Sequence, residues 1–136
     1  MVYKTTSASQ TKKIGYELGQ KLKAGGLVLL TGDLGAGKTT FIQGLAKGIG
    51  VRQRVNSPTF IIARRYKLDD NFFFHIDLYR LTSSEEVENI GISEMWQKGN
   101  VVCIEWPELV EKSAPKAVKV KFINADENNR QIEIIH

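Results

Sequence analysis

Apolar residues follow two patterns along the chain, one typical of helices and one typical of buried strands. Beyond Ser7, whose hydroxyl suits a helix N-cap, apolar residues at four-residue spacing predict a helix that runs to about Lys23. Residues 27–30 are instead continuously apolar and are bounded by glycines, which indicates a strand buried on both faces. The apolar positions of the helix face are Ile14, Leu18 and Leu22.

The rest of the chain continues this alternation of helix and strand. A second helix, apolar at Phe41, Ile42 and Leu45, is predicted to end near Gly48 and to be followed by a loop over 51–58. Short helical segments are expected to begin at Ser84 and to span 92–97 and 108–112. The predicted strands cover 2–6, 59–67, 72–79, 100–104, 117–123 and 130–135, the second and third as a hairpin and the last two as an antiparallel pair. The sum predicts an α/β sandwich around a mixed sheet.

Composition adds little to this interpretation. The chain has 136 residues, of which 42% are hydrophobic and 25% charged, values ordinary for one globular domain. The net charge of +4 permits an acidic partner without requiring one. The densest basic group either is solvated or faces nucleic acid or an acidic protein. This group consists of Arg52, Arg54, Arg64, Arg65 and Lys67.

The single cysteine and the N-terminal segment bear on the compartment. Cys103 lies in an apolar run, where a buried, inert thiol is expected, and one cysteine forms no internal disulfide. The N-terminus lacks the apolar core of a signal peptide, and no apolar run approaches the roughly 18 residues of a membrane span. We therefore expect a cytoplasmic protein without a membrane partner.

A glycine-rich turn between the first core strand and the second helix carries the clearest motif. It matches G-x-x-x-x-G-K-[ST] at every position, a phosphate-binding loop whose glycines let backbone N–H groups point at phosphate oxygens. In such a loop the Lys38 ammonium supplies a positive charge to the β- and γ-phosphates, and the Thr39 hydroxyl ligates Mg²⁺. The predicted ligand is a nucleoside triphosphate, ATP with Mg²⁺. The predicted binding residues are Gly32, Asp33, Leu34, Gly35, Ala36, Gly37, Lys38, Thr39 and Thr40.

Two acidic residues are candidates for the rest of a hydrolytic site, which needs carboxylates to hold Mg²⁺ and to place water. Strand alternation puts Asp77 on one face with His75, which indicates a polar cavity or, alternatively, a strand with one wet face. Glu105 ends an apolar strand, as in a Walker B motif, or else caps the turn before Pro107. Trp106 fits the core best, with contacts to adenine or a partner as alternatives.

Ser57-Pro58-Thr59 precedes the predicted hairpin and is interpreted as either a γ-phosphate-sensing segment or an ordinary turn. The sequence lacks the N-K-x-D motif of GTPases and the L-S-G-G-Q motif of transporter ATPases, which disfavours both of these classes. The chain also has little room for the substrate domain and lid of a small-molecule kinase. The loop in this setting predicts one P-loop NTPase-like domain over 1–136, a three-layer sandwich with a mainly parallel central sheet and antiparallel edge strands.

Taken together, the motifs resemble the TsaE (YjeE) family from end to end. The motifs that carry this resemblance are residues 32–40, then Ser57-Pro58-Thr59-Phe60, then His75-Ile76-Asp77-Leu78-Tyr79-Arg80-Leu81, then Ile104-Glu105-Trp106-Pro107-Glu108. The resemblance implies a bacterial ATPase required for N6-threonylcarbamoyladenosine at position 37 of tRNAs that read codons beginning with A. It implies action with the TsaB–TsaD pair, which hydrolysis is thought to reset between turnovers.

The resemblance also implies roles for individual residues. Lys38 binds phosphate and Thr39 ligates Mg²⁺, while Asp77 and Glu105 match the essential acidic positions of the family. Glu105 is favoured for the Mg²⁺ site, with the division of roles left open. Thr59 and Trp106 match nucleotide-responsive segments, and residues 7–11 resemble the segment near the adenine. The chain ends after its last predicted strand, so contacts of a longer tail are not expected.

Two other functions stay open beside an ATPase that serves tRNA modification. One is a binding switch that docks when ATP is bound and hydrolyses it incidentally. The other is a small phosphotransferase with Asp77 as base. A direct contact between tRNA and the basic group in the complex is also left open.

Overall fold

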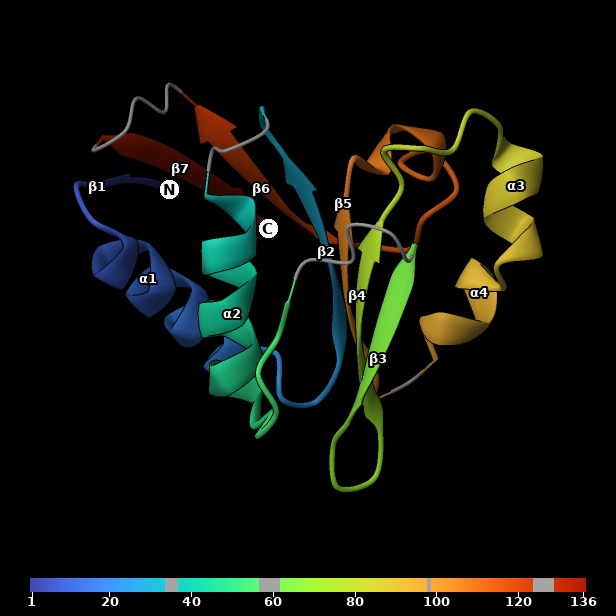
Figure 1. Ribbon diagram of the computed structural model, residues 1–136, viewed down its shortest axis with the longest axis horizontal. Helices are drawn as coiled ribbons and strands as arrows, with labels where there is room; N and C mark the ends of the chain where they lie inside the picture. The colour runs from blue at the N-terminus through green and yellow to red at the C-terminus, as the bar shows by residue number, and fades with distance from the viewer. Residues whose placement is uncertain (34–36, 57–61, 98, 124–128) are drawn as a thin grey trace.

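The structure, a computed structural model, describes residues 1–33, 37–56, 62–97, 99–123 and 129–136. Its strands are β1 (Val2–Thr5), β2 (Gly26–Thr31), β3 (Ala63–Lys67), β4 (Phe72–Asp77), β5 (Val101–Glu105), β6 (Val118–Ile123) and β7 (Arg130–Ile135). Its helices are α1 (Ala8–Lys21), α2 (Lys38–Ile49), α3 (Ser84–Asn89), α4 (Ile92–Met95) and the 3₁₀ turn η1 (Pro107–Leu109). The predicted alternation of elements is confirmed (Figure 1).

The seven strands of the described residues form one sheet with the order β1-β7-β6-β2-β5-β4-β3. The four central strands, β6, β2, β5 and β4, run parallel to one another. The outer strands are antiparallel to their neighbours: β3 to β4, β7 to β6, and β1 to β7. The predicted mixed sheet with a parallel centre and antiparallel edge strands is therefore confirmed. The parallel centre brings the carboxyl ends of β2, β4 and β5 to one edge, where α/β proteins bind ligands.

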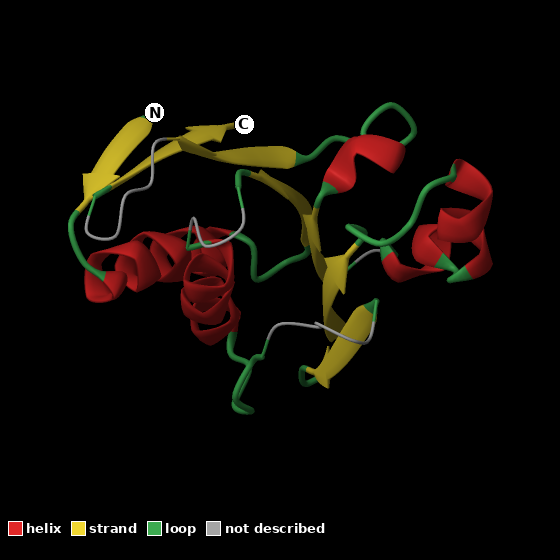
Figure 2. Ribbon diagram, turned by 45° about the horizontal axis from the view of Figure 1, so that its top comes forward, coloured by secondary structure: helices red, strands yellow, loops and turns green. Residues whose placement is uncertain are grey.

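Helices cover both faces of the sheet, which completes three layers. Helices α1 and α2 lie on one face, and α3 and α4 lie on the other (Figures 1 and 2). Alternate residues of β2 enter the two cores: Val28 and Leu30 pack with α1 and α2, whereas Leu27 and Leu29 pack on the opposite side. This explains the continuous apolar run, since both faces of β2 are buried.

Helices α1 and α2 pack more closely than their apolar residues alone predict. Ser7 caps α1 as expected, accepting a hydrogen bond from the Gln10 N–H. The contact itself is made by glycines four residues apart on each helix. A Cβ at any of them would lie within 2.1–2.2 Å of a backbone oxygen of the other helix, so only glycine allows this approach. These glycines are Gly15 and Gly19 on α1, and Gly44 and Gly48 on α2.

Most predicted boundaries differ from the observed ones by a few residues. The first helix ends at Lys21 rather than Lys23, the hairpin strand predicted to reach Tyr79 ends at Asp77, and the turn predicted for 108–112 is a 3₁₀ turn over Pro107–Leu109. The strand predicted for 59–67 begins at Ala63 within the described residues. Among the helices that the structure describes, none has the length and apolar character needed to cross a bilayer.

Candidate functional site

The glycine-rich loop joins the end of β2 to the start of α2. Its described glycines both have positive φ values, 142° at Gly32 and 95° at Gly37, a backbone region that favours glycine. A Cβ at Gly32 would also lie 2.8 Å from the Cβ of Phe122. Both observations explain why the motif has glycine at its ends. The predicted binding residues Leu34, Gly35 and Ala36 lie outside the described part of the chain.

Lys38 begins α2, and its side chain is almost completely buried at this end of the sheet. Its Nζ donates a hydrogen bond of 2.7 Å to the Gly32 carbonyl and lies 4.0 Å from the centroid of the Trp106 ring. Burial lowers the pKa of the Lys38 ammonium, and nearby carboxylates oppose that shift. These carboxylates, from the largest effect to the smallest, are Glu105, Asp77, Glu108 and Asp33. The two groups in direct contact with the ammonium, the Gly32 carbonyl and the Trp106 ring, are both neutral. A phosphate in this site would be a stronger partner.

Asp77 and Glu105 are brought side by side by the parallel pairing of β4 and β5, in which they are register partners. Glu105 also pairs with Leu30 of β2, so both carboxylates lie at the edge where the glycine-rich loop begins. Asp77 is half-buried, and its Oδ1 accepts a 2.9 Å hydrogen bond from the Tyr79 N–H. Burial raises the pKa of Asp77, and the Glu105 carboxylate adds to that effect. The structure therefore brings together the three predicted catalytic residues, Lys38, Asp77 and Glu105.

His75 lies on the same strand face as Asp77, as strand alternation predicts. The alternative of a wet strand face is wrong, because Phe73 and His75 on that face have no exposed surface. The side chain of Glu105 is bonded to His75, with 2.7 Å between the His75 Nε2 and the Glu105 Oε2. The alternative role of Glu105, a carboxylate that caps the turn before Pro107, is therefore not observed: its side chain is bonded to His75 instead.

Trp106 is half-buried and belongs to the site, so its assignment to the core is wrong. Its backbone φ is 55°, a conformation that is uncommon for a residue other than glycine. That turn presents the ring to Lys38 and to Tyr79, whose ring centroid lies 4.9 Å away. Strain of this kind is found where a side chain must be aimed at a site. Tyr79 was not among the predicted site residues. The sequence feature that could have identified it is its position two residues after Asp77, on the same face of the predicted strand.

Other residues complete the surroundings of the loop. Thr39 and Thr40 lie in the first turn of α2 and are half-buried. Arg130 of β7 packs against Gly37, where an added Cβ would lie 2.6 Å from the Arg130 Nε. The sequence held no signal for this cation, because it comes from the far end of the chain. Ser57, Pro58 and Thr59 lie outside the described residues, so their predicted role stays a prediction.

The described residues contain no group of three His, Cys, Asp or Glu side chains placed to hold a metal ion. Two carboxylates and the Thr39 hydroxyl are nevertheless the oxygen ligands that Mg²⁺ takes, and Mg²⁺ commonly completes its shell with phosphate oxygens and water. The site therefore fits a cation that arrives with a nucleotide.

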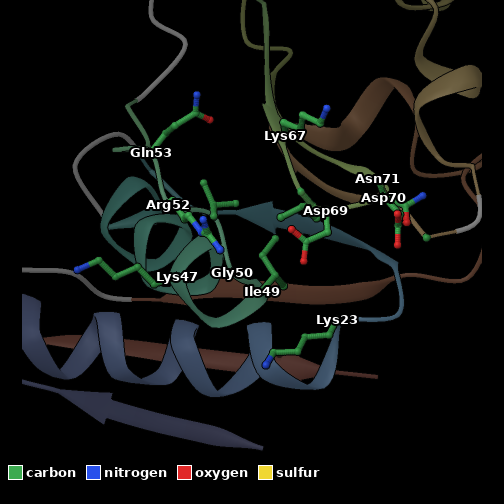
Figure 3. Close-up of a pocket in the computed structure, with 13 residues that line it drawn as sticks. Lys23, Lys47, Ile49, Gly50, Arg52, Gln53, Lys67, Asp69, Asp70 and Asn71 are labelled. Atoms are coloured by element: carbon green, nitrogen blue, oxygen red, sulfur yellow. The ribbon is translucent and has the colours of Figure 1, made fainter.

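A cavity of about 960 Å³ lies at the opposite edge of the sheet, away from the loop (Figure 3). It is bordered by the end of α2 and the β3–β4 turn, and its charged lining residues are Lys23, Lys47, Arg52, Lys67, Asp69 and Asp70. Because this cavity is remote from Lys38, Asp77 and Glu105, the candidate site for the chemistry is the loop edge and not this cavity. All five members of the basic group are exposed, and only Arg52 and Lys67 border the cavity.

Comparisons with known proteins agree with this geometry. The family model described as "Threonylcarbamoyl adenosine biosynthesis protein TsaE" matches residues 5–132. The chain is 38% identical to a protein of that name from Nostoc over 128 residues, covering 91% of this chain and 78% of that protein. It is 35% identical to the one from Bacillus subtilis over 131 residues, covering 96% and 82%. The crystal structure of Bacillus subtilis YdiB superimposes with a TM-score of 0.75 at 29% identity, covering 97% of this chain and 82% of that one.

Proposed function

The chain belongs to the TsaE family of nucleotide-binding proteins, and from that premise we propose that it is an ATP hydrolase serving N6-threonylcarbamoyladenosine formation on tRNA. One observation carries the hydrolase proposal. A buried lysine at the end of a phosphate-binding loop faces two carboxylates from neighbouring strands, the constellation that phosphoryl transfer requires. The pathway follows from the names of the relatives. Action with TsaB and TsaD at position 37 of tRNA, in the cytoplasm, is part of the same proposal.

In this proposal the triphosphate lies along the loop from Gly32 to Thr39. Lys38 exchanges the Gly32 carbonyl for phosphate oxygens, which attract its charge more strongly. Thr39 and Glu105 would hold Mg²⁺, which would supply positive charge to the β- and γ-phosphates. Asp77 orients the attacking water, because its Oδ2 has no hydrogen bond to another described residue and its surroundings favour a proton on the carboxyl group.

Replacement of Glu105 by glutamine tests hydrolysis against the other two functions. We expect Glu105→Gln to bind ATP and to hydrolyse it about 10²–10³-fold more slowly, since the amide carries no charge for the cation. Glu111→Gln is the control, because Glu111 is an exposed carboxylate whose ion-pair partner is Lys119. The measurements are phosphate release, ATP affinity and the modified nucleoside in a strain that carries each variant.

The outcomes separate the three functions. Normal nucleoside levels with Glu105→Gln would favour the binding switch, in which hydrolysis is incidental. Transfer of the γ-phosphate to a protein or metabolite, instead of release as inorganic phosphate, would favour the phosphotransferase. Loss of both hydrolysis and modification, with ATP binding retained, supports the proposal.

Asp77 also predicts a pH dependence of stability. Its folded pKa lies above the 3.8 of an ordinary aspartate, so ionisation costs stability once the pH rises above 3.8. We expect Asp77→Asn to unfold at a higher temperature than the parent chain at pH 7, because the amide removes this cost and keeps an oxygen for the Tyr79 N–H. The difference should close as the pH falls below about 3.8. Thermal unfolding between pH 3 and 8 measures it, and a less stable variant at pH 7 would contradict the assignment.

The contact between tRNA and the basic group stays a prediction. Its members are exposed, as such a contact requires. Reversing the charges of Arg52 and Arg54 should weaken tRNA binding at low salt, and an unchanged affinity would exclude this surface.

A further inference from the structure

The imidazole of His75 is fully buried beside the carboxylate of Glu105. It has no exposed surface, and its Nε2 lies 2.7 Å from the Glu105 Oε2. With a carboxylate as the acceptor, Nε2–H is the donor. The Nδ1 atom is buried and has no hydrogen-bond partner among the described residues. The bond to Glu105 is thus the one hydrogen bond of this side chain within the described part of the chain.

A histidine in this position is costly as a core residue. Its neighbours on this face of the sheet, Phe73 and Cys103, are fully buried and apolar in character. Burial raises the pKa of the Cys103 thiol, so that group stays neutral and adds no charge. A leucine would fill similar space without leaving a buried nitrogen unpaired. Packing therefore gives no reason for an imidazole here, and the bond to Glu105 does.

The sheet register explains how the two side chains meet. His75 pairs with Cys103, and Asp77 pairs with Glu105, so these four side chains lie on one face in two adjacent rows. His75 reaches diagonally from the row behind to Glu105 at the edge. It approaches from the interior of the sheet, which leaves the loop side of Glu105 to the nucleotide. The imidazole thus restricts a carboxylate whose Oε1 has no hydrogen bond to another described residue.

We propose that His75 is a positioning residue, whose Nε2–H holds the Glu105 carboxylate in one orientation for the magnesium nucleotide. This inference rests on the proposed ATP hydrolysis and names the support of its acidic residue. Groups that orient a metal-binding side chain in this way commonly change metal affinity or activity by about 10–100-fold when they are removed. In this proposal Glu105 contacts the magnesium nucleotide, and His75 acts only through Glu105.

Two amide variants that differ by one methylene test the proposal. The amide nitrogen of His75→Gln can reach the place of Nε2, whereas that of His75→Asn stops near the place of Nδ1. Both variants place an amide in the core, so any loss caused only by a polar group or by a cavity at this position should appear in both. His75→Leu removes all donors and keeps an apolar core.

We expect His75→Asn and His75→Leu to lower kcat by about 10–100-fold, with less than a threefold change in KM for ATP. His75→Gln should retain kcat within about fivefold of the parent chain. A second measurement does not depend on turnover: the rise in Tm when Mg²⁺ is added to the ATP-bound protein. This rise should shrink in His75→Asn and His75→Leu and return in His75→Gln. Combining His75→Leu with Glu105→Gln should add no further loss, because His75 acts through Glu105.

Several results would overturn the positioning role. One is a His75→Leu variant that keeps both kcat and the magnesium response, since His75 would then be a packing residue. Another is His75→Gln failing as badly as His75→Asn, since the donor at Nε2 would then be unimportant. If one variant does not fold, the remaining two carry the comparison. Absence of hydrolysis by the parent chain would count against the proposed function, while the magnesium response would still decide the role of His75.

Discussion

Replacing Lys38 by alanine is expected to lower ATP hydrolysis by at least about 10²–10³-fold and to abolish the modified nucleoside in cells. The ammonium lies at the head of α2, donates a hydrogen bond to the loop carbonyl of Gly32 and is attracted by the two carboxylates. Without it, the loop loses one of the positive charges that balance the phosphates in the ground state and in the transition state. Phosphate release by the purified chain and mass spectrometry of tRNA nucleosides measure the two effects.

The same variant should fold at least as well as the parent chain. Burial lowers the pKa of Lys38, because the loss of solvent around its ammonium outweighs the attraction of the neighbouring carboxylates. Removing it relieves that cost, so Tm should be equal or higher. Lys47→Ala is the matched control, because Lys47 is an exposed lysine on the same helix. Unchanged nucleoside levels in the Lys38→Ala strain, against a normal Lys47→Ala strain, would refute the proposed function.

Replacing Gly44 by alanine is expected to destabilise the protein by about 1–3 kcal/mol or more, although alanine is the better helix former. A Cβ at Gly44 would lie 2.1 Å from the carbonyl oxygen and 2.8 Å from the Cα of Lys12, which are backbone atoms of α1 that no rotamer change moves away. Helix α2 would have to shift from α1. Since α2 begins with Lys38, the shift also displaces the phosphate-binding residues.

Thermal unfolding of Gly44→Ala should show a Tm lower by roughly 5–15 °C. An ordinary glycine in a helix behaves in the opposite way, gaining about 1 kcal/mol on replacement by alanine. Lys47→Ala, three positions along on the exposed side of the same helix, again serves as the control and should change Tm little. A higher Tm for Gly44→Ala would show that the two helices do not approach as closely as the structure has them.

These two predictions differ in how much the sequence revealed about them. Lys38 was identified from the motif, because a phosphate-binding loop is a local structure whose residues are consecutive. The glycine contact between α1 and α2 was not identified. Gly15 and Gly19 lie beside Leu18 in a helix whose apolar spacing already accounted for its buried face, and a glycine by itself does not say what approaches it.

The acidic residues lie between these extremes. Strand alternation placed Asp77 and His75 on one face, and the end of an apolar strand marked Glu105. That Asp77 and Glu105 are register partners, and that His75 bonds to Glu105, depends on the parallel pairing of β4 with β5. Because α3 and α4 separate β4 from β5 in the chain, the hydrophobic pattern of each strand does not indicate the register between them. For the same reason the core assignment of Trp106 was wrong: its turn aims it at Lys38.

The sequence by itself determined the order of helices and strands, the phosphate-binding loop and the residues available for chemistry. Each of these follows from local spacing, since period and motif are properties of neighbouring residues. Only the tertiary structure decided which strands pair, that Arg130 from the last strand packs against Gly37, and that His75 is buried behind Glu105. These relations join segments far apart in the chain, and their energy comes from burial and register in the completed sheet.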